Sequence, residues 1–180
     1  DITNLSKSIV DGEIVDATYY LRLYEAEGNS NLSTEYELAA FALSQSWVEG
    51  YGEFGDDPKN TYGVSWENRS NPEPGSTLSL VGLNVTWSNA DGTPAYGGST
   101  HTTAKTTQEF SYESPDVEMN ITSIVEGWLD NTYENHGILL RFSGSQETNS
   151  KTFGKLKFFS SDTHTIYAPK LEVRWDDHKP

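Results

Sequence analysis

The chain has 180 residues, enough for one domain, and its 27 acidic residues outnumber its 12 basic residues, which leaves a formal charge of −15. So negative a chain is not expected to bind nucleic acid or a membrane surface, and no apolar run approaches the roughly 18–20 residues of a transmembrane helix. The absence of cysteine excludes disulfides, thiolate metal sites and cysteine nucleophiles, so 5 Trp, 10 Tyr and 7 Phe residues must help to fill the core.

The first two predicted strands lie in the first quarter of the chain. Residues 17–24 alternate, with Tyr19 and Leu21 on one face, as in a half-buried strand. Residues 36–43 are apolar on both faces, as in a central strand of a sandwich. The polar turn between them predicts that the two strands form a hairpin.

The middle of the chain is rich in turn residues. Residues 49–75 contain many Gly, Pro, Asn and Asp residues, which predicts long surface loops around one short strand at residues 63–66. A second short strand is predicted at residues 83–87. Turns follow at residues 89–94, and the polar, Thr-rich stretch after them is expected to remain loop through residue 107.

One short helix is predicted at about residues 122–130, directly after a strand at residues 117–121. The apolar residues change from alternation to helical spacing at this point: Ile121, Ile124, Val125, Trp128 and Leu129. The spacing of Ser123 and Glu126 resembles a capping box and predicts the start of the helix, and Asp130-Asn131 predicts its end.

Three more strands are predicted towards the end of the chain, at residues 138–142, 153–159 and 171–175. At least seven short strands, one helix and no internal repeat indicate an all-β protein. The predicted fold is an antiparallel β-sandwich of jelly-roll type, with the helix covering one end.

No catalytic or metal-binding motif stands out. The four histidines are too far apart for a zinc site and lie in no hydrolase motif: His101, His136, His164 and His178. Paired acids occur, but in so acidic a chain solvated carboxylates explain them better than a glycosidase site. Residues 89–92 combine Asn89, Asp91 and Gly92, which suits either a plain turn or part of a calcium loop. No cofactor is expected.

Aromatic residues crowd into the loop-rich half of the chain: Trp47, Tyr51, Phe54, Tyr62, Trp66, Trp87 and Tyr96. Exposed rings could stack on the apolar faces of sugars. Trp47 and Trp87 follow strand patterns and are predicted to be buried. Trp66 and Tyr96 are flanked by turn residues, so they are the candidate ligand-binding residues.

Several segments, taken in order, resemble a known family. They are Leu5–Ile9, Tyr20–Tyr24, Ser44–Trp47, Gly63–Trp66, Val117–Leu129, Gly137–Leu140 and Phe158–Trp175. The closing segment, with Tyr167-Ala-Pro-Lys-Leu-Glu-Val-Arg-Trp175, is the most specific of them. With these features the chain resembles the DNRLRE-type family of β-sandwich modules, in the version found in structural proteins of tailed bacteriophages, especially those of marine and cyanobacterial hosts.

The resemblance implies a jelly-roll module without enzymatic activity, located in the head, tail or fibre of a virion. Its expected partners are other virion proteins, including further copies of itself. The alternative is a carbohydrate-binding module that attaches a phage or a secreted enzyme to a surface polysaccharide, such as a host glycan.

The resemblance also predicts how the domain is organised. Residues 1–180 are expected to form a single β-sandwich domain within a longer polypeptide, with residues 75–107 as an insertion or long loop. Family members begin with a strand before the segment that matches Leu5–Ile9. Asp1-Ile2 is therefore expected to be the end of that strand, whose body would lie upstream and whose absence would leave a sheet edge unfilled.

Overall fold

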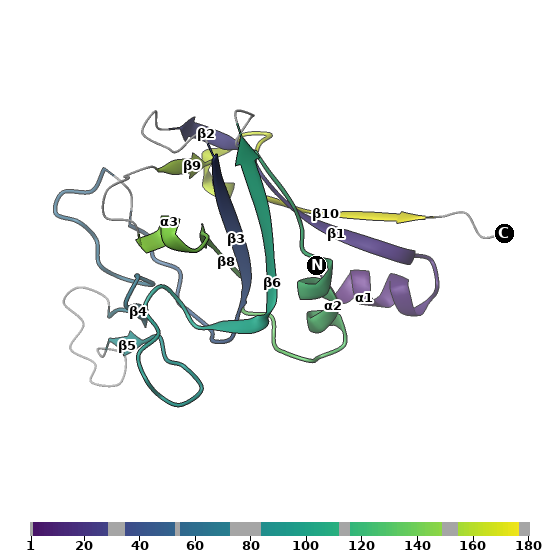
Figure 1. The fold of residues 1–180 in the computed structure, drawn as a ribbon, viewed down its shortest axis with the longest axis horizontal. Helices are drawn as coiled ribbons and strands as arrows, with labels where there is room; N and C mark the ends of the chain where they lie inside the picture. The colour runs from purple at the N-terminus through teal and green to yellow at the C-terminus, as the bar shows by residue number, and fades with distance from the viewer. Residues whose placement is uncertain are drawn as a thin grey trace. The chain divides into compact units, whose positions relative to one another are not determined.

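The computed structural model describes residues 2–28, 35–52, 55–72, 84–111, 116–148 and 155–176 (Figure 1). These residues form mostly β-strands in several antiparallel sheets, with a few short helices between them. The elements are α1 (Ile2–Val10), β1 (Val15–Leu23), β2 (Glu25–Gly28), β3 (Glu35–Leu43), β4 (Asn68–Ser70), β5 (Val85–Thr86), β6 (Thr100–Ser111), β7 (Val117–Asn120), α2 (Thr122–Leu129), β8 (Ile138–Phe142), α3 (Ser145–Thr148), β9 (Leu156–Phe158), the 3-10 helix η1 (Ser161–Thr163) and β10 (Lys170–Asp176). The predicted all-β, sandwich-like fold is confirmed.

One three-stranded sheet has the order β10-β1-β7, and β1 runs antiparallel to both of its neighbours. Tyr19 of β1 lies opposite Val173 of β10, and Leu21 lies opposite both Leu171 of β10 and Met119 of β7. Figure 1 shows β1 and β10 running side by side although they come from opposite ends of the chain. The alternation of apolar residues therefore located both strands correctly.

A second three-stranded sheet has the order β6-β3-β8. Its central strand, β3, is buried from Leu38 to Leu43, as the apolar residues on both faces predicted. The predicted hairpin of β1 with β3 is wrong. Each of these strands is central in its own sheet and is flanked by partners from later in the chain, and β2, which follows β1, pairs with β9.

The helix α2, the strands β1 and β7 and the residue between β7 and α2 supply the largest fully buried side chains. The helix α2 matches the predicted helix. The largest fully buried residues are Tyr19, Val117, Met119, Ile121, Ile124 and Val125. Hydrogen bonds join β1 to the start of α2, since the Tyr19 N–H donates to Thr122 Oγ1 (3.0 Å) and the Ile121 N–H donates to the Tyr19 carbonyl (2.8 Å). Trp128 is only half-buried.

The predicted capping box at Ser123 and Glu126 is wrong. The helix begins at Thr122, and the preceding Ile121 makes no side-chain cap. Instead, the Thr122 N–H donates to Asn120 Oδ1 (3.0 Å), so a residue of the preceding strand satisfies this orphan donor. The end of the helix is as predicted, because Asp130 caps it and Asn131 turns into the left-handed region with φ +61°.

The start of the chain also differs from the prediction. Residues 2–10 form α1, not the end of a strand, so the expectation of a sheet that lacks an upstream strand loses its basis. Leu5 and Ile9 are four residues apart, lie on one face of the helix and are half-buried, whereas Lys7 is exposed. Gly12, at φ +70°, ends the helical turn. Further short helical segments, α3 and η1, were not predicted either.

Three predictions for the loop-rich half need correction. The strand predicted at residues 63–66 is displaced to β4, because the Ser65 N–H donates to the Asn68 carbonyl (2.7 Å) and closes a turn there. The expected loop ends earlier than residue 107, because β6 begins at Thr100. The Thr residues of β6 are β-branched and favour a strand although none of them is buried. The strand predicted at residues 83–87 is shorter than expected, because β5 covers only Val85–Thr86.

The insertion expected at residues 75–107 is described only in part, because residues 75–83 lie outside the described ranges.

The contacts divide the chain into two compact units. Unit 1 comprises residues 1–41, 103–133 and 140–180, and unit 2 comprises residues 42–102 and 134–139. Unit 1 contains α1, α2 and the β10-β1-β7 sheet, whereas unit 2 contains β4, β5 and the loops between them. Contact clusters alone do not define independently folding domains, so the single domain over residues 1–180 stays a prediction.

Candidate binding surfaces

The two residues predicted to bind a ligand, Trp66 and Tyr96, are both exposed in unit 2, by 54% and 60% respectively. The Gly97 N–H donates to the Trp66 carbonyl (2.7 Å), which joins the two loops that carry them. The Trp66 ring lies so close to Gly97 that a Cβ there would be 2.7 Å from the ring atoms Cη2 and Cζ2. The structure therefore presents an indole and a phenol ring on adjoining loops.

A buried tryptophan supports these loops. Trp87 is 3% exposed, as predicted, and its Nε1 donates to the Ser65 carbonyl (3.0 Å). Its backbone bonds the Glu67 carbonyl (3.1 Å) and the Ala95 N–H (2.9 Å), so Trp87 holds the residues next to Trp66 and Tyr96 in place. The prediction that Trp47 is buried is wrong: it is 40% exposed, and its Nε1 donates to the His136 carbonyl (2.9 Å).

A second aromatic pair lies in the same unit. Tyr51 stacks on Tyr62, with ring centroids 4.9 Å apart, and Tyr51 is 57% exposed. The backbone beneath them is tightly packed, because a Cβ on Gly50 would lie 2.4 Å from the Tyr62 carbonyl oxygen. The predicted crowding of aromatic residues is thus resolved into one buried anchor, Trp87, and several partly exposed rings. Phe54 lies outside the described residues.

The loop at residues 89–93 is a hydrogen-bonded turn. Asp91 Oδ1 accepts bonds from the Thr93 N–H (2.9 Å) and hydroxyl (2.6 Å), and these bonds lower the pKa of Asp91. Asn89 Nδ2 donates to the Thr93 hydroxyl oxygen (3.0 Å). These bonds show a turn at residues 89–93, and the alternative of a calcium loop stays a prediction. Within the described ranges, no three His, Asp or Glu residues are grouped as a metal site would require.

Strand β10 lies at the edge of the β10-β1-β7 sheet and carries exposed apolar side chains. Leu171 is 41% exposed and Trp175 is 50% exposed, and Val173 between them is half-buried. An edge strand presents backbone N–H and C=O groups that another strand can pair with. The sequence pattern predicted that Leu171, Val173 and Trp175 face one way, but only the sheet order places them at an edge.

The opposite face of this sheet carries a network of charges that the sequence analysis missed. Arg22 and Arg174 both pair with Glu118, and Arg174 Nε lies 2.6 Å from Glu172 Oε1. The Arg174 guanidinium also lies 3.9 Å from the centroid of the Tyr20 ring. The signal was present in the sequence as charges at alternate strand positions, but only the register brings them together.

Comparisons with protein-family models, with curated proteins and with solved structures found no match. In the part of the chain that the structure describes, no helix is long and apolar enough to cross a membrane. The DNRLRE-type resemblance therefore stays a prediction, and the function must be argued from the surfaces of the molecule.

Proposed function

We propose that this chain is a non-enzymatic structural module of a tailed-phage virion, and that it assembles with further copies of itself through the edge of β10. The observation that carries the assembly step is the exposed, apolar edge strand with its alternating charges. The placement in a virion rests on the resemblance of the closing segment, much of which is β10.

The charges on β10 are self-complementary. Four positions on one face alternate in sign: Lys170, Glu172, Arg174 and Asp176. If two β10 strands pair antiparallel about Val173, each Lys170 lies opposite Asp176 of the other copy, and Glu172 lies opposite Arg174. On the other face, Leu171 lies opposite Trp175. Opposite charges and apolar pairs across strands are both stabilising, and a two-fold axis repeats each of them twice.

The same charges could instead protect the edge from pairing, as charged residues do on many edge strands. The two roles differ in one respect. A protective edge needs only charge, whereas a pairing edge needs opposite charges at matched positions. A charge swap therefore distinguishes them.

The test is the oligomeric state of residues 1–180 by analytical ultracentrifugation, compared among three proteins. Asp176→Lys would place two lysines opposite each other, and we expect it to weaken self-association at least about tenfold. Lys170→Glu with Asp176→Lys restores the matched signs and should restore the affinity. A monomeric parent chain, or equal effects of the single and double variants, would contradict this assembly.

Placement in the particle needs a separate experiment. Mass spectrometry and cryo-EM of purified virions from the source phage should locate the chain in head, tail or fibre. Its absence from purified particles would contradict the virion part of the proposal and leave self-association untouched.

A second candidate function is carbohydrate binding, which the exposed Trp66 and Tyr96 favour. Two exposed rings on adjoining loops, braced by a buried tryptophan, provide the rigid apolar surface on which the C–H face of a sugar stacks. We expect a glycan array to detect selective binding. Trp66→Ala or Tyr96→Ala should abolish it while the circular dichroism spectrum is kept.

The matched control is Trp175→Ala, which removes an exposed tryptophan from unit 1. It should leave glycan binding unchanged and weaken self-association. Loss of glycan binding in this variant as well would show that the binding is not specific to the Trp66 surface.

A further inference from the structure

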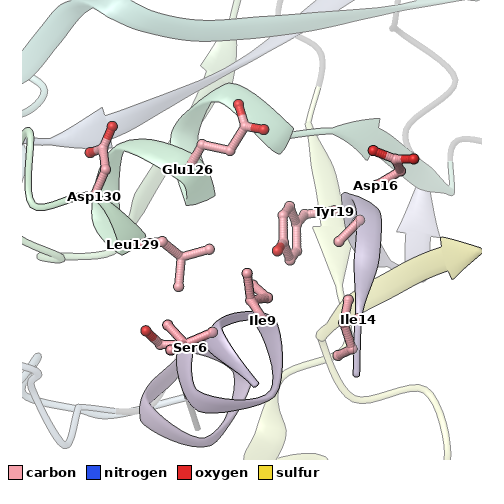
Figure 2. Close-up of a pocket in the computed structure, with 10 residues that line it drawn as sticks. Ser6, Ile9, Ile14, Asp16, Tyr19, Glu126, Leu129 and Asp130 are labelled. Carbon is pink, nitrogen blue, oxygen red and sulfur yellow. The ribbon is translucent and has the colours of Figure 1, made fainter. Parts of the chain in front are cut away.

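A pocket of about 580 Å³ lies in unit 1 between α1, the start of β1 and α2. Figure 2 shows the Tyr19 ring reaching from β1 into the space that Ile9, Ile14 and Leu129 surround. These aliphatic side chains give the pocket an apolar interior large enough for a short alkyl chain.

The charged residues that line this pocket all have the same sign. Asp16 comes from the start of β1, Glu126 comes from α2, and Asp130 is the residue that caps the end of α2. None of the described lining residues is basic, and none of the ion pairs within the described ranges involves these three carboxylates. Lys7 belongs to α1 but does not line the pocket. A cation in this pocket would therefore meet only attractive charges.

Tyr19 provides an independent sign of a ligand. Its side chain is 2% exposed and lines the pocket, yet the described residues provide its hydroxyl with no hydrogen bond. Burial and the Glu126 carboxylate both raise the pKa of Tyr19, so the hydroxyl stays protonated at neutral pH. Among the described residues, Trp128 Nε1 is the buried side-chain polar atom without a partner, so the Tyr19 hydroxyl is open to the pocket and can bond to a polar group there.

The backbone of β1 is also unusual where it borders the pocket. A bulge between Val15 and Thr18 interrupts the pairing with β10, and Asp16 adopts φ +51°, which is uncommon for a residue other than glycine. Bulges redirect side chains and are frequent next to binding sites. Here the bulge contains Asp16 and Ala17, which both line the pocket.

From these observations we infer that the pocket binds an alkylammonium group: the apolar stem lies against Ile9, Ile14 and Leu129, and the ammonium lies among the carboxylates and the Tyr19 hydroxyl. A free amine and a lysine side chain of another protein share this chemistry. The proposal does not depend on self-association of β10 or on carbohydrate binding.

The test uses NMR titration of the whole chain with four probes. They are pentylammonium, pentanol with the same shape but no charge, pentanoate with the opposite charge, and Nα-acetyl-lysine N-methylamide. We expect an ammonium probe to shift the amide signals around Tyr19 and Glu126, and to bind at least about tenfold more tightly than pentanol. Pentanoate should not bind. Whichever ammonium probe binds more tightly identifies the source of the ligand.

Three variants check the residues. Glu126 is exposed, and Glu126→Gln should weaken ammonium binding about three- to tenfold. Tyr19→Phe tests the other contact, because it removes only the hydroxyl group from the pocket. Asp162→Asn, on the exposed η1, is the control with the same change in charge and should bind as the parent does. Equal binding of pentanol and pentylammonium, equal effects of Glu126→Gln and Asp162→Asn, or no shift at about 50 mM of either ammonium probe would overturn the proposal.

Discussion

At the scale of single residues, Gly97 determines where the exposed Trp66 ring lies. It has φ +82°, and a Cβ at this position would meet the ring at 2.7 Å. Gly97→Ala should therefore destabilise the protein by about 2–3 kcal/mol, through backbone strain and displacement of the ring. Urea unfolding would measure the loss, and tryptophan fluorescence would report the movement of Trp66.

Gly92 is a matched control for Gly97. Its φ of +84° is nearly the same, but a Cβ there would have no neighbour within 4 Å. Gly92→Ala should cost only the backbone strain, about 1 kcal/mol, and leave the fluorescence unchanged. Equal losses of unfolding free energy in the two variants would mean that the contact between Gly97 and the Trp66 ring contributes little to stability.

At the scale of elements, the packing of α2 depends on Gly127. The Tyr133 ring lies against this residue, where a Cβ would be 2.2 Å from Cζ, and the Tyr133 hydroxyl donates to the carbonyls of Ser123 (3.0 Å) and Ile124 (3.1 Å). Gly→Ala normally stabilises a helix by about 1 kcal/mol. Here Gly127→Ala should instead destabilise the folded protein by about 1–3 kcal/mol, because the added methyl group displaces the Tyr133 ring from its position against the helix.

A double-mutant cycle tests the cause of that effect. In a Tyr133→Ala background, Gly127→Ala no longer has a ring to displace, so it should become neutral or stabilising in thermal unfolding. If it destabilises both backgrounds alike, some contact other than Tyr133 is responsible.

The β10-β1-β7 sheet makes a prediction about pH. Hydrogen bonding and charge from Arg174 and Arg22 lower the pKa of Glu118 below its ordinary value of 4.5. The resulting stabilisation is complete above that ordinary value and is lost as the pH falls through the lower folded-state pKa. Glu118→Gln should therefore reduce the fall in melting temperature between about pH 4.5 and pH 3.

Glu67→Gln in the exposed part of unit 2 is the control for this pH dependence, since it removes a carboxyl outside the network. It should keep the steep acid dependence of the parent. A parent-like pH profile for Glu118→Gln would show that the arginine contacts do not act on stability.

At the scale of the whole molecule, the formal charge of −15 should govern the response to salt. Self-repulsion destabilises the folded chain at low ionic strength, and we expect this repulsion to outweigh the attraction within the exposed ion pairs of the described residues. Raising NaCl from about 10 to 200 mM shortens the screening length from about 30 Å to below 10 Å and should raise the melting temperature by a few degrees. Scanning fluorimetry at low protein concentration would measure it, and a decrease would mean that ion pairs such as Arg22–Glu118 dominate instead.

The hydrophobic pattern by itself determined which segments become β1, β3, β7, α2, β8 and β10. Burial of one face imposes a period that is visible in the sequence, and burial of both faces, as in β3, leaves a continuous apolar run. Turn residues around Trp66 and Tyr96 likewise indicated candidates for exposed rings. Both are local properties of the sequence, and neither requires knowing which strand or loop a segment packs against.

Only the tertiary structure decided how these elements pair and what they build together. Alternation says that β1 is a strand but not that it pairs with β10, and so the predicted hairpin with β3 failed. The short α1 and the displaced β4 depend on contacts and turns that periodicity does not record. The pocket at Tyr19 needs a helix, a bulge and a second helix from distant parts of the chain, and a site assembled by long-range packing has no local pattern from which to predict it.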